Sequence, residues 1–212
     1  MTLYVVTDPR LSKGRSHEEV CAKAIEGGAN VIQLRDKDAT TKQLCDYGRR
    51  LRELARKAGA LFIVNDRVDV ALAVDADGVH VGQDDLPAQE ARRILGRGKI
   101  VGVSTSNLED ARIAAEAGAD YVAIGAIYET RSVKADAGTP VGPEAVANLR
   151  KHTKLPIVAI GGINRSNVSE VVRAGADGIA VISAVVSADD IKAAASELKR
   201  IIVEGRARHA EG

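Results

Sequence analysis

The chain has 212 residues, of which 45% are hydrophobic, so it is long enough to bury a full core and is expected to form one domain over residues 1–212. Its 30 Lys and Arg against 29 Asp and Glu give a formal charge of +1, which provides no general attraction to nucleic acid or to an anionic membrane. We therefore expect neither partner, and any charged ligand must be held by local groups.

The ends of the chain and its two cysteines give no sign of a specific function. The N-terminus shows neither a signal peptide nor a long apolar segment, so a cytoplasmic location is expected. Cys21 and Cys45 lack a partner motif and are interpreted as structural. From about residue 206 we expect a tail of uncertain order. The sequence leaves formation of a homo-oligomer open.

Short apolar runs alternate with helical patterns along the whole chain. Eight runs are candidate strands, some with the turn that precedes them, over residues 3–6, 28–34, 61–64, 76–81, 100–103, 118–124, 156–160 and 175–181. Helices are predicted over residues 17–26, 44–58, 68–74, 87–95, 108–117, 143–150, 165–174 and 188–203. Strands without polar alternation are typical of a sheet that is covered on both faces.

Eight alternating strands and helices predict an α/β fold, a (β/α)8 barrel in a single domain. The alternative is an open, doubly wound sheet, which more often has about five or six strands and a glycine-rich turn after the first. Here the first strand ends in Thr7-Asp8-Pro9-Arg10, without that turn, so the barrel is favoured.

Two cations follow the second predicted strand. Gln33, Arg35 and Lys37 alternate, so they share one face, while Leu34 and Asp36 point to the other. Two cations held together at a barrel mouth favour a phosphate or diphosphate ligand. The alternative is that they pair with acidic side chains of the barrel.

Two other strand ends carry acidic clusters, Asn65-Asp66 and Asp84-Asp85. Such hard oxygen ligands suit Mg²⁺ completed by water and substrate phosphate, and the lack of thiolates argues against zinc. The alternative is that these acids cap the helices that follow. The neighbouring cations favour a metal and diphosphate site.

Later loops offer phosphate-binding groups. Gly161-Gly162 follows the seventh strand and Ile182-Ser183-Ala184 ends the eighth, where barrels frequently bind phosphate through backbone N–H groups, although a Gly-Gly pair also serves as an ordinary tight turn. The long stretch 128–142 is either a lid over the mouth or a solvated connection. Ser104 could donate to a substrate oxygen, whereas Ser106 or Asn107 could cap the next helix. His80 is either a core histidine or a ligand contact.

On these residues the chain resembles the thiamine-phosphate synthase family over nearly its full length. The most specific segments are Gln33-Leu34-Arg35-Asp36-Lys37, Asn65-Asp66-Arg67-Val68-Asp69 and the stretch from Asp77 to Asp85. The resemblance implies a transferase that condenses 4-amino-2-methyl-5-hydroxymethylpyrimidine diphosphate with 4-methyl-5-(2-phosphoethyl)thiazole, releasing diphosphate and thiamine phosphate. Its two substrates are small and phosphorylated.

The resemblance also implies roles for single residues. Asp66 and Asp85 would supply carboxylates to one Mg²⁺ per subunit. Substrate-binding residues would be Gln33, Arg35, Lys37, Asn65, Ser104, Thr130, Ser132, Lys134, Gly162, Ile182 and Ser183. The residues expected to act in catalysis are Arg35, Lys37, Ser104 and Lys134. The cations and the metal would stabilise the leaving diphosphate in a dissociative step.

Two positions depart from the family pattern. The loop after the sixth strand usually reads Pro-Thr-x-Thr-Lys, but here it reads Glu129-Thr130-Arg131-Ser132-Val133, so that Lys134 comes one residue late. Either Lys134 or Arg131 could supply the charge. Ala126 stands where proline is common.

Two alternative functions remain at this point. One is the related thiazole tautomerase, whose loop can also read Glu-Thr after an aromatic residue, but whose catalytic histidine would fall at Ala126. The other is a phosphate-binding barrel without catalysis, which Val133 would favour if it disables the loop.

Overall fold

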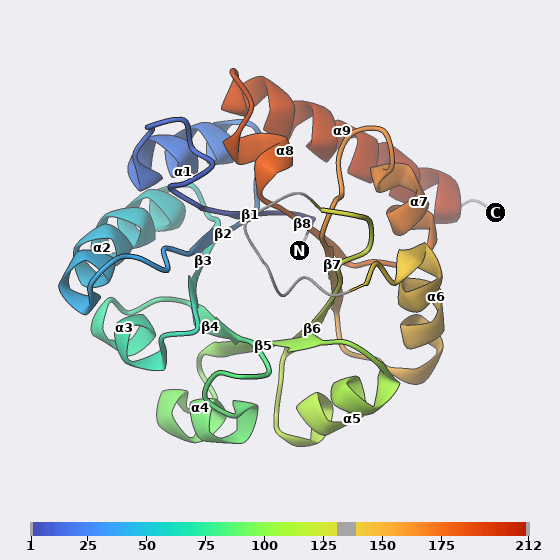
Figure 1. Cartoon of the computed structure of the whole chain (residues 1–212), viewed down its shortest axis with the longest axis horizontal. Coiled ribbons are helices and arrows are strands. Elements are labelled where there is room, and N and C mark those ends of the chain that lie inside the picture. The colour runs from blue at the N-terminus through green and yellow to red at the C-terminus, as the bar shows by residue number, and fades with distance from the viewer. Residues whose placement is uncertain (1, 131–138, 211–212) are drawn as a thin grey trace.

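Parallel strands pair in chain order around a closed barrel (Figure 1). The structure, a computed structural model, describes residues 2–130 and 139–210. Within these residues, β8 pairs with β1 and closes the sheet, which confirms the predicted (β/α)8 fold. The eight strands are β1 (Leu3–Val6), β2 (Val31–Leu34), β3 (Leu61–Asn65), β4 (Gly78–Val81), β5 (Ile100–Thr105), β6 (Tyr121–Ile124), β7 (Ile157–Ile160) and β8 (Gly178–Val181).

Helices form the outer ring in Figure 1. They are α1 (His17–Glu26), α2 (Thr41–Lys57), α3 (Val68–Ala73), α4 (Ala88–Leu95), α5 (Leu108–Glu116), α6 (Gly142–His152), α7 (Val168–Arg173), α8 (Ser183–Val186) and α9 (Ile191–Ala210). Local signals set several starts, because Ser16, Thr40 and Asn107 accept hydrogen bonds from the first turns of α1, α2 and α5. Among the helices of the described ranges, none has the length and apolar character needed to cross a membrane.

The last predicted helix, over residues 188–203, differs from the structure. A separate short helix, α8, forms first, and α9 begins at Ile191 after the Asp190 carboxylate accepts a hydrogen bond from the backbone N–H of Ala193 (2.9 Å). The buried side chains of Ile191, Leu198 and Ile202 hold α9 against the barrel. The predicted tail begins inside α9, whose backbone remains helical to Ala210.

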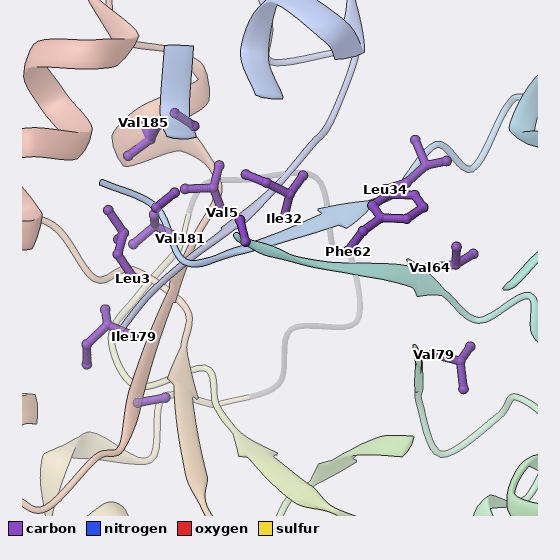
Figure 2. Packing of buried hydrophobic residues seen from close by; sticks show 14 of the residues in the cluster. Leu3, Val5, Ile32, Leu34, Phe62, Val64, Val79, Ile179, Val181 and Val185 are labelled. Atoms are coloured by element: carbon purple, nitrogen blue, oxygen red, sulfur yellow. The ribbon is translucent and has the colours of Figure 1, made fainter. Parts of the chain in front are cut away.

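Most strands contribute to two apolar layers, which explains why their sequences are largely apolar. Outward side chains such as Leu3, Val5 and Phe62 pack between the sheet and the helices (Figure 2). Inward side chains such as Tyr4 and Ile63 fill the barrel interior. Both faces are therefore buried, as expected for a parallel barrel.

Candidate active site

A cavity of about 530 Å³ opens at the carboxyl ends of the strands. This volume lies within the range of about 300–1,000 Å³ that small-molecule sites occupy. Ten of the residues predicted from the sequence line it: Arg35, Lys37, Asn65, Asp66, Asp85, Ser104, Thr130, Gly162, Ile182 and Ser183. Residues that are far apart in the chain therefore meet at one barrel mouth.

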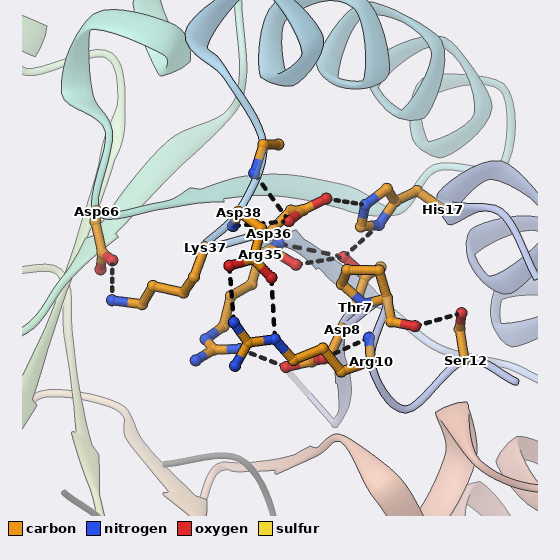
Figure 3. Close-up of polar contacts among 12 residues, drawn as sticks. Thr7, Asp8, Arg10, Ser12, His17, Arg35, Asp36, Lys37, Asp38 and Asp66 are labelled. Atoms are coloured by element: carbon orange, nitrogen blue, oxygen red, sulfur yellow. Dashed lines mark hydrogen bonds and ion pairs between the residues drawn. The ribbon is translucent and has the colours of Figure 1, made fainter. Parts of the chain in front are cut away.

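Arg35 lies deep in this cavity and is only 6% exposed. Its guanidinium pairs with the buried carboxylate of Asp8, with Nη1 and Oδ2 2.5 Å apart (Figure 3). The predicted alternative, pairing with an acidic side chain of the barrel, is thus found at Arg35. Its Nε is buried and has no hydrogen-bond partner among the residues that the structure describes. A buried donor left unpaired is costly, so Arg35 retains a capacity to bind an acceptor.

The rim of the cavity brings one cation and two carboxylates together. Lys37 Nζ lies 2.9 Å from Asp66 Oδ2, as Figure 3 shows. Burial, followed by the neighbouring Asp66, raises the pKa of the Asp85 carboxyl, while Lys37 acts in the opposite direction. Two carboxylates so close repel each other unless a cation or a proton intervenes. Their oxygens are the donor type that Mg²⁺ prefers, with water and phosphate completing the shell.

The alternative in which these acids cap helices is wrong. α3 begins after Arg67 and α4 after Pro87, and neither helix has a side-chain hydrogen bond at its N-cap. Asp85 instead accepts a hydrogen bond from the backbone N–H of Gly82 (2.8 Å), which holds its carboxylate at the end of β4. Asp66 has a φ of 61°, a left-handed conformation that non-glycine residues rarely adopt and that clusters at functional sites.

A network behind Arg35 and Lys37 links β1, β2 and α1. Asp36 points away from the cavity, as the alternation predicts, and His17 Nε2 lies 3.2 Å from its Oδ2. The other ring nitrogen of His17 lies 2.9 Å from Thr7 Oγ1, which also accepts a hydrogen bond from the Arg35 backbone N–H (3.2 Å). Figure 3 shows these contacts around the turn that carries both cations. No sequence pattern marked His17, Thr7 or Asp8 as site residues.

A second polar network lies below the cavity. Gln33 is 5% exposed and lines a smaller space of about 50 Å³ rather than the main cavity. Its Nε2 donates to the Tyr4 hydroxyl (2.7 Å). His80 contacts Tyr121 OH through Nδ1 (3.0 Å) and Ser104 Oγ through Nε2 (2.9 Å), so it is both a hydrogen-bonded core histidine and a neighbour of the cavity. Tyr4 and Tyr121 were not singled out from the sequence.

The loops after β7 and β8 border the opposite side of the cavity. Gly161 and Gly162 have φ values of +100° and +66°, and a Cβ at Gly162 would lie 2.7 Å from the backbone oxygen of Glu129. Glycine is therefore required by conformation and by space. Ile182 and Ser183 line the same side of the cavity.

The loop after β6 is described only in part. Thr130 lines the cavity, and the peptide bond between Gly125 and Ala126 is cis. The predicted site residues Ser132 and Lys134 lie outside the described residues, as do Arg131 and Val133. Asn107 caps α5, which supports the capping alternative for that residue.

Comparisons with known proteins identify what this arrangement is similar to. The family described as Thiamine monophosphate synthase matches residues 3–185. Thiamine-phosphate synthase of Chloroflexus aurantiacus is 56% identical over 200 residues, covering 94% of this chain and 92% of the relative. The enzyme of Moorella thermoacetica is 50% identical over 206 residues, covering 97% and 98%.

Solved structures agree with these relatives. Thiamine phosphate pyrophosphorylase from Pyrococcus furiosus superposes with a TM-score of 0.89 at 45% identity, covering 96% of each chain. A 3-hexulose-6-phosphate synthase superposes with a TM-score of 0.66 at 20% identity, which reflects the shared barrel alone.

Proposed function

The chain belongs to the thiamine-phosphate synthase family, and we propose that the cavity at its barrel mouth carries the family reaction through Arg35, Lys37 and Ser104. That reaction condenses the pyrimidine diphosphate with the thiazole phosphate and gives thiamine phosphate and diphosphate. The observation that supports the assignment of the site is the meeting of two cations with paired carboxylates in one cavity. The full-length relatives leave neither the tautomerase nor a non-catalytic barrel as the favoured function.

The diphosphate is proposed to lie between Arg35 and the rim. Arg35 Nε has no hydrogen-bond partner among the described residues, so it can donate to a phosphate oxygen. A charge-assisted hydrogen bond of this kind is among the stronger ones in proteins. Lys37, which is half exposed, is long enough to exchange Asp66 for the incoming anion. Asn65 and Ser104 add neutral polar groups on β3 and β5.

Asp66 and Asp85 are the residues proposed to hold Mg²⁺. Burial, followed by the neighbouring Asp66, raises the pKa of Asp85, and a divalent cation would stabilise the two carboxylates there. Two protein carboxylates with substrate phosphate match the usual shell of Mg²⁺. When bound, the ion would neutralise charge on the diphosphate as it leaves. The described residues contain no group of three or more acidic, histidine or cysteine ligands. Water and substrate phosphate would supply the remaining ligands of the ion.

The chemistry proposed for the chain is a dissociative substitution. Arg35 and Lys37 stabilise the negative charge that builds on the diphosphate as its C–O bond breaks. The electron-rich aminopyrimidine carries the resulting benzylic-type cation, and the thiazole nitrogen captures it. This step requires the thiazole to be held in line and water to be excluded, but it requires no side-chain nucleophile.

The thiazole phosphate is proposed to bind on the side of the cavity formed by Gly162, Ile182 and Ser183. Gly162 lines this cavity, and its close approach to the backbone of Glu129 excludes a side chain at that position. Backbone N–H groups at the end of a barrel strand suit a phosphate, and loops seven and eight frequently provide them.

The proposed function is tested by measuring diphosphate release with both substrates, with and without Mg²⁺. We expect release only when both substrates and the metal are present, and a strong loss of turnover with an increased Mg²⁺ requirement in Asp66→Asn and Asp85→Asn. Full activity of both variants without added Mg²⁺ would show that the metal assignment is wrong. Activity on a carboxylated thiazole phosphate alone would indicate the tautomerase instead.

A further inference from the structure

Five polar side chains form a continuous chain of hydrogen bonds beneath the cavity. It starts at Gln33 on β2, passes through Tyr4 on β1 and Tyr121 on β6, and ends with His80 on β4 and Ser104 on β5. The successive distances are 2.7 Å, 3.0 Å, 3.0 Å and 2.9 Å. We call this hydrogen-bonded chain the floor relay.

The packing of the barrel holds the floor relay in place. Tyr4 and Tyr121 are each 1% exposed, with ring centroids 6.3 Å apart in an edge arrangement. The rings of Tyr121 and His80 stack at 5.6 Å. A Cβ at Gly102 would lie 2.0 Å from the Tyr121 ring, so the glycine on β5 provides the space that this ring occupies. The packing of the barrel interior therefore fixes the side chains of the floor relay in position.

The proton of each hydroxyl gives the relay a direction. The Gln33 amide nitrogen can only donate, so the Tyr4 oxygen accepts from it. Within the part of the chain that the structure describes, the other hydrogen-bond partner of the Tyr4 hydroxyl is Tyr121. The Tyr121 oxygen therefore accepts a hydrogen bond from the Tyr4 O–H. Burial raises the pKa of both phenols, so both remain protonated and able to donate.

The same direction continues to the cavity. Tyr121 accepts the hydrogen bond from Tyr4 and therefore donates its own O–H to Nδ1 of His80, which then carries its single proton on Nε2. That proton points at Ser104 Oγ. Because Ser104 accepts from the histidine, its hydroxyl proton is left to donate elsewhere, and Ser104 lines the cavity.

We propose that the floor relay fixes His80 as the neutral Nε2–H tautomer and thereby commits Ser104 to donate a hydrogen bond to an acceptor atom of the pyrimidine diphosphate. Tyr4, Tyr121 and His80 are then positioning residues that act through Ser104. The inference rests on the proposed role of Ser104 in the family reaction. Its consequence is selection for substrates that present an acceptor, either a diphosphate oxygen or a ring nitrogen, at that point.

The direction of the relay is tested by nitrogen-15 NMR on the full chain with labelled histidine. The chain has four histidines, and loss of a signal in His80→Gln assigns His80. We expect a protonated Nε2 and an unprotonated Nδ1. In Gln33→Glu an ionised carboxylate can only accept, so at a pH where the new carboxyl group is ionised the direction of the whole relay should reverse and place the proton on Nδ1. A protonated Nδ1 in the unsubstituted protein, or no change in Gln33→Glu, would overturn the proposal.

The action through Ser104 is tested by a double-mutant cycle with steady-state kinetics. We expect Tyr121→Phe to lower kcat/KM for the pyrimidine diphosphate about tenfold, the factor of one hydrogen bond, and to leave the KM for thiazole phosphate unchanged. In a Ser104→Ala background the same substitution should have no further effect. An equal loss in both backgrounds would mean that Tyr121 is merely structural.

A matched control separates the relay from general loss of a phenol. Tyr47→Phe removes a hydroxyl from α2, outside the barrel, and should leave kcat/KM unchanged. The NMR measurement needs no turnover, so a failure of the relay and a failure of the proposed function are seen in different experiments.

Discussion

Replacement of Asp85 by asparagine is expected to stabilise the metal-free protein while it removes the response to Mg²⁺. Burial and the neighbouring Asp66 raise the pKa of Asp85 above its value in the unfolded chain, about 3.9. The contribution of Asp85 to stability is therefore full below that value and is lost as the pH rises through the folded pKa. Near pH 7 an ionised Asp85 opposes folding, and asparagine removes that charge while keeping an oxygen for the Gly82 N–H.

The size of the effect follows from the partial exposure of Asp85. Solvent screens a half-buried carboxylate and Lys37 offsets part of the repulsion, so the gain is about 1 kcal/mol or less. In a domain of this length, 1 kcal/mol corresponds to roughly 2–4 °C in Tm. We therefore expect Asp85→Asn to melt about 2 °C above the unsubstituted protein near pH 7 in a chelator.

Thermal melting followed by circular dichroism, in chelator and in millimolar Mg²⁺, measures both parts of this prediction. The Tm of the unsubstituted protein should rise with Mg²⁺, whereas that of Asp85→Asn should not. The difference between the two proteins in chelator should shrink as the pH falls through the raised pKa of Asp85 and should be gone below about 4. Asp84→Asn, one position away and exposed, is the control and should behave like the unsubstituted protein. A lower Tm for Asp85→Asn in chelator, or a retained Mg²⁺ shift, would refute the reasoning.

Three further substitutions test the cavity and its supports. Asp8→Asn leaves a buried guanidinium without its counter-charge and should lower the free energy of unfolding in urea by about 3–5 kcal/mol, whereas the exposed Asp38→Asn should change it little; equal losses would contradict a buried pair. His17→Leu removes two hydrogen bonds behind the cationic turn and should raise KM for the pyrimidine diphosphate about tenfold, with KM for thiazole phosphate unchanged in the same kinetic assay. Gly162→Val meets backbone 2.7 Å away and should weaken thiazole phosphate binding in calorimetry, whereas Gly98→Ala, in open space, should bind as before.

The strands and their ends could be predicted because each carries its own signal. Uninterrupted apolar runs marked all eight strands, and period-two geometry placed Arg35 and Lys37 in the mouth with Asp36 behind them. These inferences need only the local pattern and the rule that parallel strands end at one face of a barrel. That rule places the strand-end residues in one cavity, whereas Thr130 was predicted only through the resemblance to the family.

The partners of these residues could not be predicted, because they depend on how the barrel closes. Tyr4 and Tyr121 are separated by 117 positions and lie in runs that read as plain apolar strand. Only register and closure bring their hydroxyls together. Asp8 was read as part of the first loop, with no signal that it would neutralise Arg35 across β1 and β2.

The helical region that follows β8 shows another reason why the sequence alone did not predict the structure. A break between α8 and α9 falls at Ser187–Asp190, where small and polar residues had been read as the start of one helix. The sequence pattern favours a single helix because alanine and serine fit either reading. The contact of Arg15 with the backbone oxygens of Val186 and Ala188 (2.9 Å and 2.7 Å) stabilises the turn, and this contact comes from a loop more than 170 residues away.

The polar side chains on the floor of the cavity and those at its rim are stabilised in different ways. On the floor, Tyr4 and Tyr121 are fully buried and are satisfied by fixed neighbours, so their geometry changes little when a ligand binds. At the rim, Asp66 and Asp85 remain crowded, with Lys37 as a partial counter-charge. Below them, Arg35 Nε lacks a hydrogen-bond partner in the part of the chain that the structure describes. A metal ion bound together with diphosphate would stabilise both groups, since the cation would neutralise the carboxylates and the anion would accept a hydrogen bond from Arg35. Binding of the two should therefore be cooperative, with each raising the affinity of the other by the same factor.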